Sequence, residues 1–272
     1  MTDHQMRRYS RQILLPEVGG RGQSSLMDAH IILQGCGSIG APLALHLAAA
    51  GIGRLSLFEK DHPVTPAWQR ASGLEATSEH PFPSRRACLA EALGRHFNPD
   101  LDVTLVDSDT LSKDGTLFSS PSIVVFADAL PDSPPHVLRV LNAQKACKAV
   151  VLATVEQGKG VLNVGSIPHN SVDEEGGCVW CALSSIRRAS HHHESSFSVT
   201  QLNTLSLLDS ITSGILATMA AGEILRCLIA DASRSLPTGH LTTALLFDAL
   251  TGEERAVSVE TAADCLLCGD RG

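Results

Sequence analysis

The hydrophobic pattern between residues 30 and 61 predicts a strand, a glycine turn, a helix and a second strand. The apolar run 31–33 is typical of a buried parallel strand, and a glycine-rich hexapeptide follows it at 35–40. Apolar residues then recur at helical spacing from Ala41, and the glycines at 51 and 53 suit a helix C-terminus. Residues 55–58 form the second apolar strand. This alternation is typical of a parallel sheet covered by helices.

The remainder of the chain continues the alternation and then weakens it. Further strands are predicted at 101–106, 123–126, 150–154, 161–164 (as an edge strand) and 245–248 (as the last strand). Helices are predicted at 84–97, 133–148 and 211–230, and a surface helix within 1–28. Residues 62–84 and 166–200 are interpreted as loops, the first long and Pro-rich and the second polar and exposed.

We therefore expect an α/β fold with a Rossmann-like, mostly parallel sheet, helices on both faces, an antiparallel extension and a zinc-stapled C-terminal tail. The length of 272 residues and a hydrophobic content of 43% suit one substantial core. We divide the chain into an N-terminal arm, residues 1–28, and a single domain, residues 29–272, whose nucleotide-binding core is 29–155.

The glycine turn indicates a nucleotide site. Gly35, Gly37 and Gly40 fit the pattern G-x-G-x-x-G between a strand and a helix, and Glu59 follows the next strand. Glycines let backbone N–H groups approach a phosphate, the helix N-terminus attracts negative charge, and the acid accepts from ribose hydroxyls. The alternative is a glycine turn that only packs the helix closely on the sheet.

Two further positions carry charge near the predicted site. Asp128 ends the strand 123–126, where open α/β sheets bind ligands, although it equally suits a helix N-cap. Arg85 and Arg86 begin the helix 84–97, where cations oppose the helix dipole. We therefore expect these arginines to have another partner, such as phosphate.

The net charge of −8 argues against nucleic acid or an anionic membrane as the main partner. We find neither an N-terminal signal pattern nor an apolar run near the length of a membrane span, and so expect a cytoplasmic protein without a membrane partner. Eight cysteines in such a chain favour metal ligands or free thiols over disulfides.

Two C-x-x-C pairs predict a structural zinc site. Cys178 and Cys181 form the first pair, and Cys265 and Cys268 form the second. Four thiolates make a closed tetrahedral site, which here would join the C-terminal tail to a distant loop. A redox pair is the competing interpretation. Of the other four cysteines, interpreted as small buried hydrophobes, Cys36 is placed where oxidation would affect the glycine loop. The triplet 191–193 of histidines is interpreted as part of an exposed loop rather than a metal site.

Several segments together resemble one family. They are MRRYSRQILLPEVG at the N-terminus, GCGSIG, AAAGIGRLSLFEKD, HFNPDLDV, AAGEILR, FDALTG and the paired C-x-x-C motifs, in this order along nearly the whole chain. This series resembles the ThiF/MoeB/HesA family, the bacterial relatives of ubiquitin-activating enzymes. The resemblance indicates ATP rather than a nicotinamide dinucleotide.

The resemblance implies a homodimeric enzyme that binds ATP and Mg²⁺, with structural Zn²⁺. Such enzymes adenylate the C-terminal glycine carboxylate of a ubiquitin-like sulfur carrier protein that ends in Gly-Gly, and they release pyrophosphate. By this resemblance, Gly35, Gly37 and Gly40 line the phosphates, Glu59 stands at the position of the ribose-binding aspartate, and Asp61 is the second acid at the end of that strand. Arg70 matches the arginine of the S-N-L-x-R-Q motif, and Arg86 matches a phosphate-contacting lysine. Asp128 matches the acid that holds magnesium, and Arg11 matches an arginine that reaches into the partner subunit's site. Among these, the catalytic roles fall to Arg11, Arg70 and Asp128.

Besides Glu59 for an aspartate and Arg86 for a lysine, the chain departs from the family pattern at three further places. The S-N-L-x-R-Q motif reads PAWQRA at 66–71, Ala129 replaces an Asn, and no cysteine lies between Cys181 and Ser213, which argues against a thioester intermediate. Two hypotheses follow. The chain is an active adenylyltransferase, acting on a carrier or alternatively on a peptide or small carboxylate, or it is a non-catalytic paralogue that serves as a dimeric binding scaffold.

Overall fold

The computed structural model describes residues 1–59, 62–74, 84–106, 123–128, 149–156, 159–165, 178–191, 202–229, 243–249, 251–260 and 265. These residues form an eight-stranded sheet in the order β3-β2-β1-β4-β5-β6-β7-β8. The strands are β1 (His30–Gln34), β2 (Arg54–Phe58), β3 (Asp102–Val106), β4 (Ile123–Asp128), β5 (Ala149–Glu156), β6 (Lys159–Gly165), β7 (Thr243–Asp248) and β8 (Glu253–Ser258).

The first five strands of this order are parallel, as predicted for a Rossmann-like core. Their register aligns Gln34 of β1 with Phe58 of β2 and with Phe126 of β4, so the carboxyl ends of these strands share one edge of the sheet. The strand order reverses between β1 and β4, since β2 and β3 extend to one side and β4 and β5 to the other. Ligands of open α/β sheets bind at this kind of reversal.

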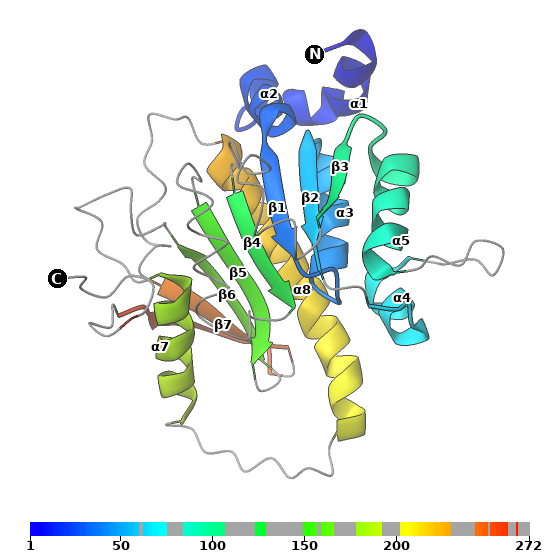
Figure 1. Cartoon of the computed structure of the whole chain (residues 1–272). Helices are drawn as coiled ribbons and strands as arrows, with labels where there is room; N and C mark the ends of the chain where they lie inside the picture. Colours follow the sequence, from blue (N-terminus) through cyan, green and yellow to red (C-terminus); the bar gives the residue numbers. More distant parts are fainter. Residues whose placement is uncertain are drawn as a thin grey trace.

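Helix α3 (Gly40–Ala50) and helix α8 (Leu202–Ile229) pack on each other behind the parallel strands in Figure 1. α3 ends at Gly51, whose φ of +95° is the left-handed conformation of a helix C-cap, as the sequence predicted. Helix α5 (Arg85–Ala92) packs on β3 and continues into a π-helical turn, η1 (Leu93–Phe97), which contacts α3. Both lie within the predicted helix 84–97.

α8 corrects one statement of the sequence analysis. Its segment Ser210–Ile229 is long and apolar enough to cross a membrane by length and composition, so an apolar run of that length does exist. The helix packs against α3, α2, β5 and β6. Its buried apolar side chains are Leu216, Ala217, Ala220, Ala221, Ile224 and Leu228. A helix with this burial is the core helix of an α/β fold.

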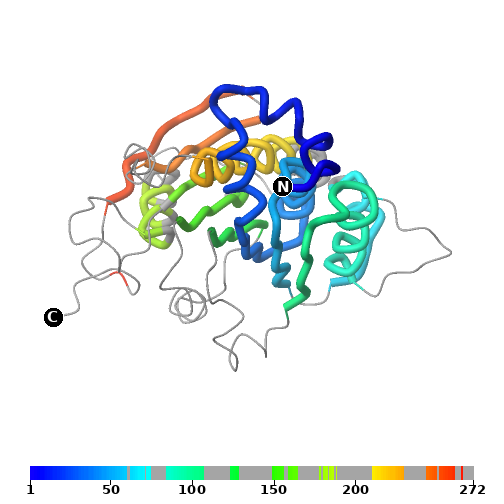
Figure 2. Tube along the Cα trace, turned by 90° about the horizontal axis from the view of Figure 1, so that it is seen from above, coloured from blue at the N-terminus to red at the C-terminus, as the bar shows by residue number. Residues whose placement is uncertain are grey.

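The N-terminal arm forms two helices, α1 (Asp3–Ile13) and α2 (Gly19–Asp28), where the sequence predicted one surface helix. Thr2 and Gln5 close a capping box at the start of α1. Tyr9 is buried, and the close approach of its ring to Gly51 leaves no room for a Cβ there. The arm lies at the amino-terminal end of β1 and β2, as Figure 2 shows from that end.

The antiparallel extension is confirmed, but two predictions about it are wrong. β6 is not an edge strand, because β5 and β7 pair with it on both sides. β7 is not the last strand, because β8 pairs with it after a turn at Gly252, where φ is +69°. Only Val257 is buried among the six residues of β8, and the five exposed residues include two glutamates and an arginine. A strand with so little apolar pattern is missed from sequence.

Both predicted loops contain a helix. Within 62–84, the structure forms α4 (Pro66–Ser72), with Thr65 as N-cap and Gly73 as C-cap. Within 166–200, it forms α7 (Val179–His191), which packs on β5, β6, β7 and β8. Pro66 at the first helical position and Gly73 beyond the last are helix signals that the prolines of the loop obscured. The predicted helix 133–148 lies outside the described residues.

Candidate nucleotide site and cysteine cluster

The glycine turn surrounds the carboxylate of Asp128 with hydrogen-bond donors. Gly37 N–H and Gly40 N–H donate to Asp128 Oδ2 at 2.8 and 2.9 Å, and Ile39 N–H donates to Oδ1 at 2.6 Å. Ser38 Oγ adds a hydrogen bond to Oδ1 at 3.3 Å. We call these four donors the anion cradle. Their convergence on two carboxylate oxygens shows that the turn binds a negatively charged group at the N-terminus of α3, where the helix dipole favours it.

The turn that forms the cradle has no room for a Cβ atom at Gly35, Gly37 or Gly40. Gly35 has a φ of +100°, and a Cβ there would meet the carbonyl oxygen of Ala127. A Cβ on Gly37 would lie 2.7 Å from the carboxyl group of Asp128, within the space of the bound anion. A Cβ on Gly40 would meet the carbonyl oxygen of Gly35. The residues therefore fit a phosphate group, which needs N–H donors and an open approach.

Asp128 comes to the cradle from the end of β4. Its φ of +67° is the left-handed conformation, unusual for a residue other than glycine but accessible to aspartate. The sequence left two interpretations of Asp128, a metal-binding acid and a helix N-cap. In the structure the carboxylate caps α3, although the residue comes from a strand rather than from the segment before the helix. Its role as a magnesium ligand stays a prediction.

Glu59 lies beside the cradle as predicted. Its Oε1 accepts from Cys36 N–H at 3.1 Å and lies 3.5 Å from Arg85 Nη2, and its side chain is 10% exposed. Burial raises the pKa of Glu59, and the Cys36 N–H and the Arg85 guanidinium lower it in part. The second oxygen, Oε2, is buried and has no hydrogen-bond partner among the described residues, so it can accept from a ligand hydroxyl.

Trp68 connects α4 to the glycine turn, a contact that the sequence analysis did not predict. Trp68 Nε1–H donates to the carbonyl oxygen of Cys36 at 2.6 Å, and its ring is 4% exposed. The peptide groups of Cys36 are thus held by Trp68 on one side and Glu59 on the other. Arg70 lies two residues later on α4 with an exposed side chain. The indole therefore fixes the helix that carries this arginine.

The two arginines that begin α5 have protein partners. Arg85 pairs with Glu59, and Arg86, which is buried, donates from Nη1 to the carbonyl oxygen of Val106 at 2.9 Å. Both arginines therefore have interaction partners outside their own helix, as expected from their position in its first turn. For Arg86 one such group is the end of β3, so its predicted contact with phosphate stays a prediction.

A second polar contact reaches the cradle from α8. Ser213 Oγ lies 3.0 Å from Ser38 Oγ, and both Ser213 and its neighbour Thr212 are buried. Thr212 Oγ1 has no hydrogen-bond partner. Both hydroxyls lie within the predicted helix 211–230, but no site residue was predicted there, since nothing local marks which of its residues face the glycine turn.

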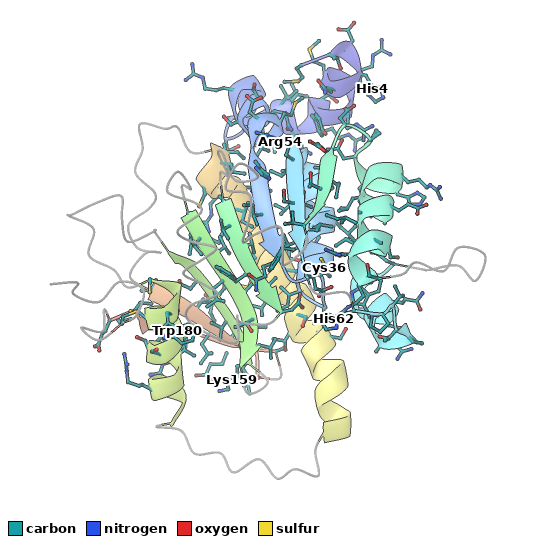
Figure 3. All side chains as sticks on the ribbon, in the orientation of Figure 1. His4, Cys36, Arg54, His62, Lys159 and Trp180 are labelled. Atoms are coloured by element: carbon teal, nitrogen blue, oxygen red, sulfur yellow. The ribbon has the colours of Figure 1, made fainter. Side chains whose placement is uncertain are left out.

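Arg11 lies far from the cradle of its own chain. The next residue, Gln12, donates from Nε2 to the carbonyl oxygen of Ala49, near the C-terminus of α3. The cradle is at the N-terminus of this helix, and 11 residues span about 16 Å. Figure 3 shows the same separation, with His4 of α1 at one end of the sheet and Cys36 toward the other. Asp61 and Ala129 lie outside the described residues.

Three of the four predicted zinc ligands meet. The Sγ atoms of Cys178, Cys181 and Cys265 lie within 4.8 Å of one another, with Cys178 Sγ 3.9 Å from Cys181 Sγ and 3.6 Å from Cys265 Sγ. Such a cluster fits a thiolate-bound ion, since three thiols converge on one point without forming a disulfide. Cys268 lies outside the described residues. α7 starts directly after Cys178 and carries Trp180 beside the cluster (Figure 3).

The other described cysteines are buried or partly buried. The pKa of the Cys36 thiol is raised well above its ordinary value by burial and by the negative charges of Glu59 and Asp128. Burial likewise raises the pKa of Cys88, and it raises that of Cys227 to about 11. Thiols that stay protonated at neutral pH are poor nucleophiles, which argues against the redox role suggested for Cys36. The structure describes only the backbone of His191 in the histidine triplet, as the last residue of α7.

Sequence comparison identifies several relatives. The adenylyltransferase and sulfurtransferase MOCS3 of Bos taurus is 29% identical over 272 residues, which are 100% of this chain and 55% of the relative. The sulfur carrier protein ThiS adenylyltransferase of Escherichia coli (strain K12) is 26% identical over 273 residues, which are 99% of this chain and 97% of the relative. The chain thus spans about half the length of the MOCS3 relatives that it matches.

Solved structures with the same fold include E. coli MccB with ATP and PaaA. MccB has a TM-score of 0.62 and 17% identity, over 96% of this chain and 74% of that one. PaaA has a TM-score of 0.68 and 15% identity, over 95% of this chain and 84% of that one. The sequence profile of the ThiF family matches residues 9–267, nearly the whole chain. The chain therefore belongs to the ThiF family.

Proposed function

We propose that this chain is an ATP-dependent adenylyltransferase that activates the C-terminal glycine carboxylate of a ubiquitin-like sulfur carrier protein. The observation that carries the proposal is the anion cradle of Gly37, Ser38, Ile39 and Gly40 at the strand-order reversal, with Glu59 beside it. Relatives of nearly the same length, in E. coli and in Thermus thermophilus, are named as sulfur carrier protein adenylyltransferases. The site favours a nucleotide phosphate as ligand, and the names of the relatives favour a carrier protein as the second substrate.

The reaction needs little from protein side chains beyond binding and charge stabilisation. An oxygen of the carrier's terminal carboxylate attacks the α-phosphorus of ATP, a new O–P bond forms, and the bond to the bridging oxygen of pyrophosphate breaks. The carboxylate is already ionised at neutral pH, so no general base is required. Negative charge develops on the pyrophosphate oxygens, and N–H donors with arginines stabilise it there.

The cradle and its neighbours divide these tasks. The N–H groups of Gly37, Ile39 and Gly40 bind phosphate oxygens, and Glu59 accepts from the ribose hydroxyls through its unpartnered Oε2. Arg70 approaches the phosphates from α4, which Trp68 holds against the turn. Gly35 permits the backbone to enter the turn. Asp61 and Arg86 are assigned to the same site by their positions in the sequence.

Two ions complete the proposal. Asp128 would hold Mg²⁺, because its carboxylate offers oxygen ligands of the kind that this ion prefers, and the ion would neutralise charge on the phosphates. Cys178, Cys181, Cys265 and Cys268 would hold structural Zn²⁺, for which three converging thiols are the supporting observation. Reduced thiolate ligands suit the cytoplasm, where we place the protein.

We also propose that the enzyme is a homodimer in which Arg11 acts at the partner subunit's site. α1 lies at the end of α3 opposite to the cradle, so Arg11 is about one helix length away from the cradle of its own chain. Its side chain is exposed. An arginine supplied by a second subunit stabilises transition-state charge in the same way as one supplied in cis.

ATP–pyrophosphate exchange tests the proposed function. Purified enzyme is incubated with Mg-ATP, labelled pyrophosphate and candidate carrier proteins, each with and without its last glycine. We expect exchange that depends on one carrier and on its intact terminus. Exchange that requires a peptide or small carboxylate instead would reassign the substrate. ATP binding without exchange for any carboxylate would favour the scaffold hypothesis.

A further inference from the structure

The anion cradle is fully committed to a group of the protein itself. All three N–H donors and the Ser38 hydroxyl point at the two oxygens of Asp128, at 2.6 to 3.3 Å. A phosphate that accepts from the same N–H groups must place its oxygens where the Asp128 oxygens now lie. The carboxylate and a phosphate therefore compete for one set of donors.

Two anions cannot share the cradle without a cation. Two negative charges in hydrogen-bonding reach of the same donors repel each other more strongly at a protein site than in bulk water. A carboxylate that has left the cradle remains beside the incoming phosphate, because its backbone is fixed: Asp128 pairs with Thr154 in the sheet, and Thr154 Oγ1 donates to its carbonyl oxygen at 3.4 Å. The Arg85 guanidinium that approaches the turn is already paired with Glu59.

A divalent ion on the phosphates removes this repulsion. It turns the displaced carboxylate from a competing anion into a ligand, since carboxylate oxygens are preferred ligands of Mg²⁺. The movement is a rotation of the Asp128 side chain about a fixed backbone, with the donors passing from one anion to the other. Metal-free nucleotide gains no such compensation.

We propose that Asp128 is a specificity-determining residue that occupies the phosphate site in the free enzyme and so makes nucleotide binding depend on magnesium. The enzyme then selects Mg-ATP over metal-free ATP and over free phosphate. This inference rests on the proposed nucleotide site, but it assigns Asp128 a role in the free enzyme that adenylation does not require. It predicts that removing the carboxylate improves one kind of binding while it abolishes turnover.

The competing account makes Asp128 a permanent cap of α3 that nucleotide never displaces. The phosphates would then bind beside an intact cap, and removal of the carboxylate would loosen the turn. Metal-free binding would weaken or stay unchanged in that case. The two accounts predict opposite signs for the same measurement.

Isothermal titration of ATP in EDTA and of Mg-ATP distinguishes them, with binding rather than activity as the readout. The variants are Asp128→Asn, which removes the charge and tolerates the positive φ, and Asp128→Gly, which empties the cradle without backbone strain. The matched control is Asp102→Asn, the same change of charge at the amino end of β3, on an exposed residue. Circular dichroism confirms that each variant is folded.

We expect both Asp128 variants to bind metal-free ATP at least about tenfold more tightly than wild type, which is about 1.4 kcal/mol. The gain in affinity that wild type shows with magnesium should shrink in both variants, and Asp102→Asn should match wild type. Equal or weaker metal-free binding by the two variants would overturn the inference while Mg-ATP binding by wild type left the proposed function in place. If wild type bound neither form of ATP, the proposed nucleotide site itself would fall.

Discussion

The parallel strands β3, β2, β1, β4 and β5 carry the anion cradle at their carboxyl ends, whereas the antiparallel strands β6, β7 and β8 pack with α7 beside the cysteine cluster. In the parallel half, the short segment between β1 and α3 supplies all the donors, and the neighbouring strand β4 supplies Asp128. In the antiparallel half, Cys178 meets Cys265 across 87 positions of sequence. The first site follows from local chain geometry, and the second needs a long-range contact that a metal ion would secure.

This difference implies that the two halves respond to different perturbations. The cradle depends on backbone donors and on space without Cβ atoms, so it is sensitive to single atoms near the turn. The cysteine cluster depends on closing a long loop, so it is sensitive to loss of a bound ion or of one thiol.

Asp128→Ala should reduce magnesium-dependent turnover by about a thousandfold or more. Without the carboxylate, the magnesium ion that neutralises the phosphates loses its protein ligand. ATP–pyrophosphate exchange measures the loss. The variant should keep the oligomeric state of wild type in sedimentation. Turnover equal to that of wild type would contradict the assignment of Asp128 to the magnesium site.

Gly40→Ala and Gly37→Ala form a pair that distinguishes folding from binding. A Cβ at Gly40 meets the backbone carbonyl of Gly35, so the variant should lose about 3 kcal/mol of stability or more. The three atoms nearest to a Cβ at Gly37 belong to the Asp128 carboxyl group, a side chain that can move, so this variant should fold and lose nucleotide affinity. Denaturation and titration with Mg-ATP measure the two effects. Equal stability losses in both variants would show that the turn has no such division.

Removal of zinc by a chelator should lower the melting temperature by roughly 5–10 °C, because closure of the loop between Cys178 and Cys265 is lost. Cys265→Ser should reproduce the shift and make the chelator ineffective. Mg-ATP affinity should change little, since the cradle lies in the parallel half. An unchanged melting temperature after stoichiometric zinc loss would contradict the structural role.

The smallest expected effect concerns the protonation of Glu59. Burial raises its pKa above the ordinary value of 4.5, so the folded protein holds this proton more tightly than the unfolded chain does. The stability that this difference contributes is fully present below pH 4.5 and is lost as the pH rises through the folded pKa. Glu59→Gln removes the titration. The unfolding free energy of wild type minus that of the variant should therefore fall from pH 4.5 to 7. A constant difference would contradict a raised pKa of Glu59 in the folded protein.

The sequence predicted the parallel core and most of the cradle because the relevant signals are local. Gly35, Gly37 and Gly40 stand between an apolar strand and a helical pattern, and Glu59 follows the next strand. Asp128 could be placed at the same edge because it ends a strand of the same apolar kind.

The missed features have physical reasons that sequence patterns do not carry. Trp68 lies in a helix within a proline-rich segment that was predicted to be a loop. Ser213 lies in a helix whose apolar pattern does not indicate which residues face the turn. β8 buries only Val257 and so has almost no strand pattern. The dipole argument required partners for Arg85 and Arg86, but only the structure shows Glu59 and Val106 in that place.

The central claim is that the cradle holds ATP while a carrier carboxylate attacks it, and the most direct test is the intact mass of the carrier after incubation with enzyme and Mg-ATP. We predict that the carrier gains the mass of an adenylyl group at its terminal glycine, and that hydroxylamine converts this product to a hydroxamate. A carrier lacking its last glycine should stay unmodified. An unmodified mass for the full-length carrier that stimulates exchange would contradict adenylation as the reaction of this site.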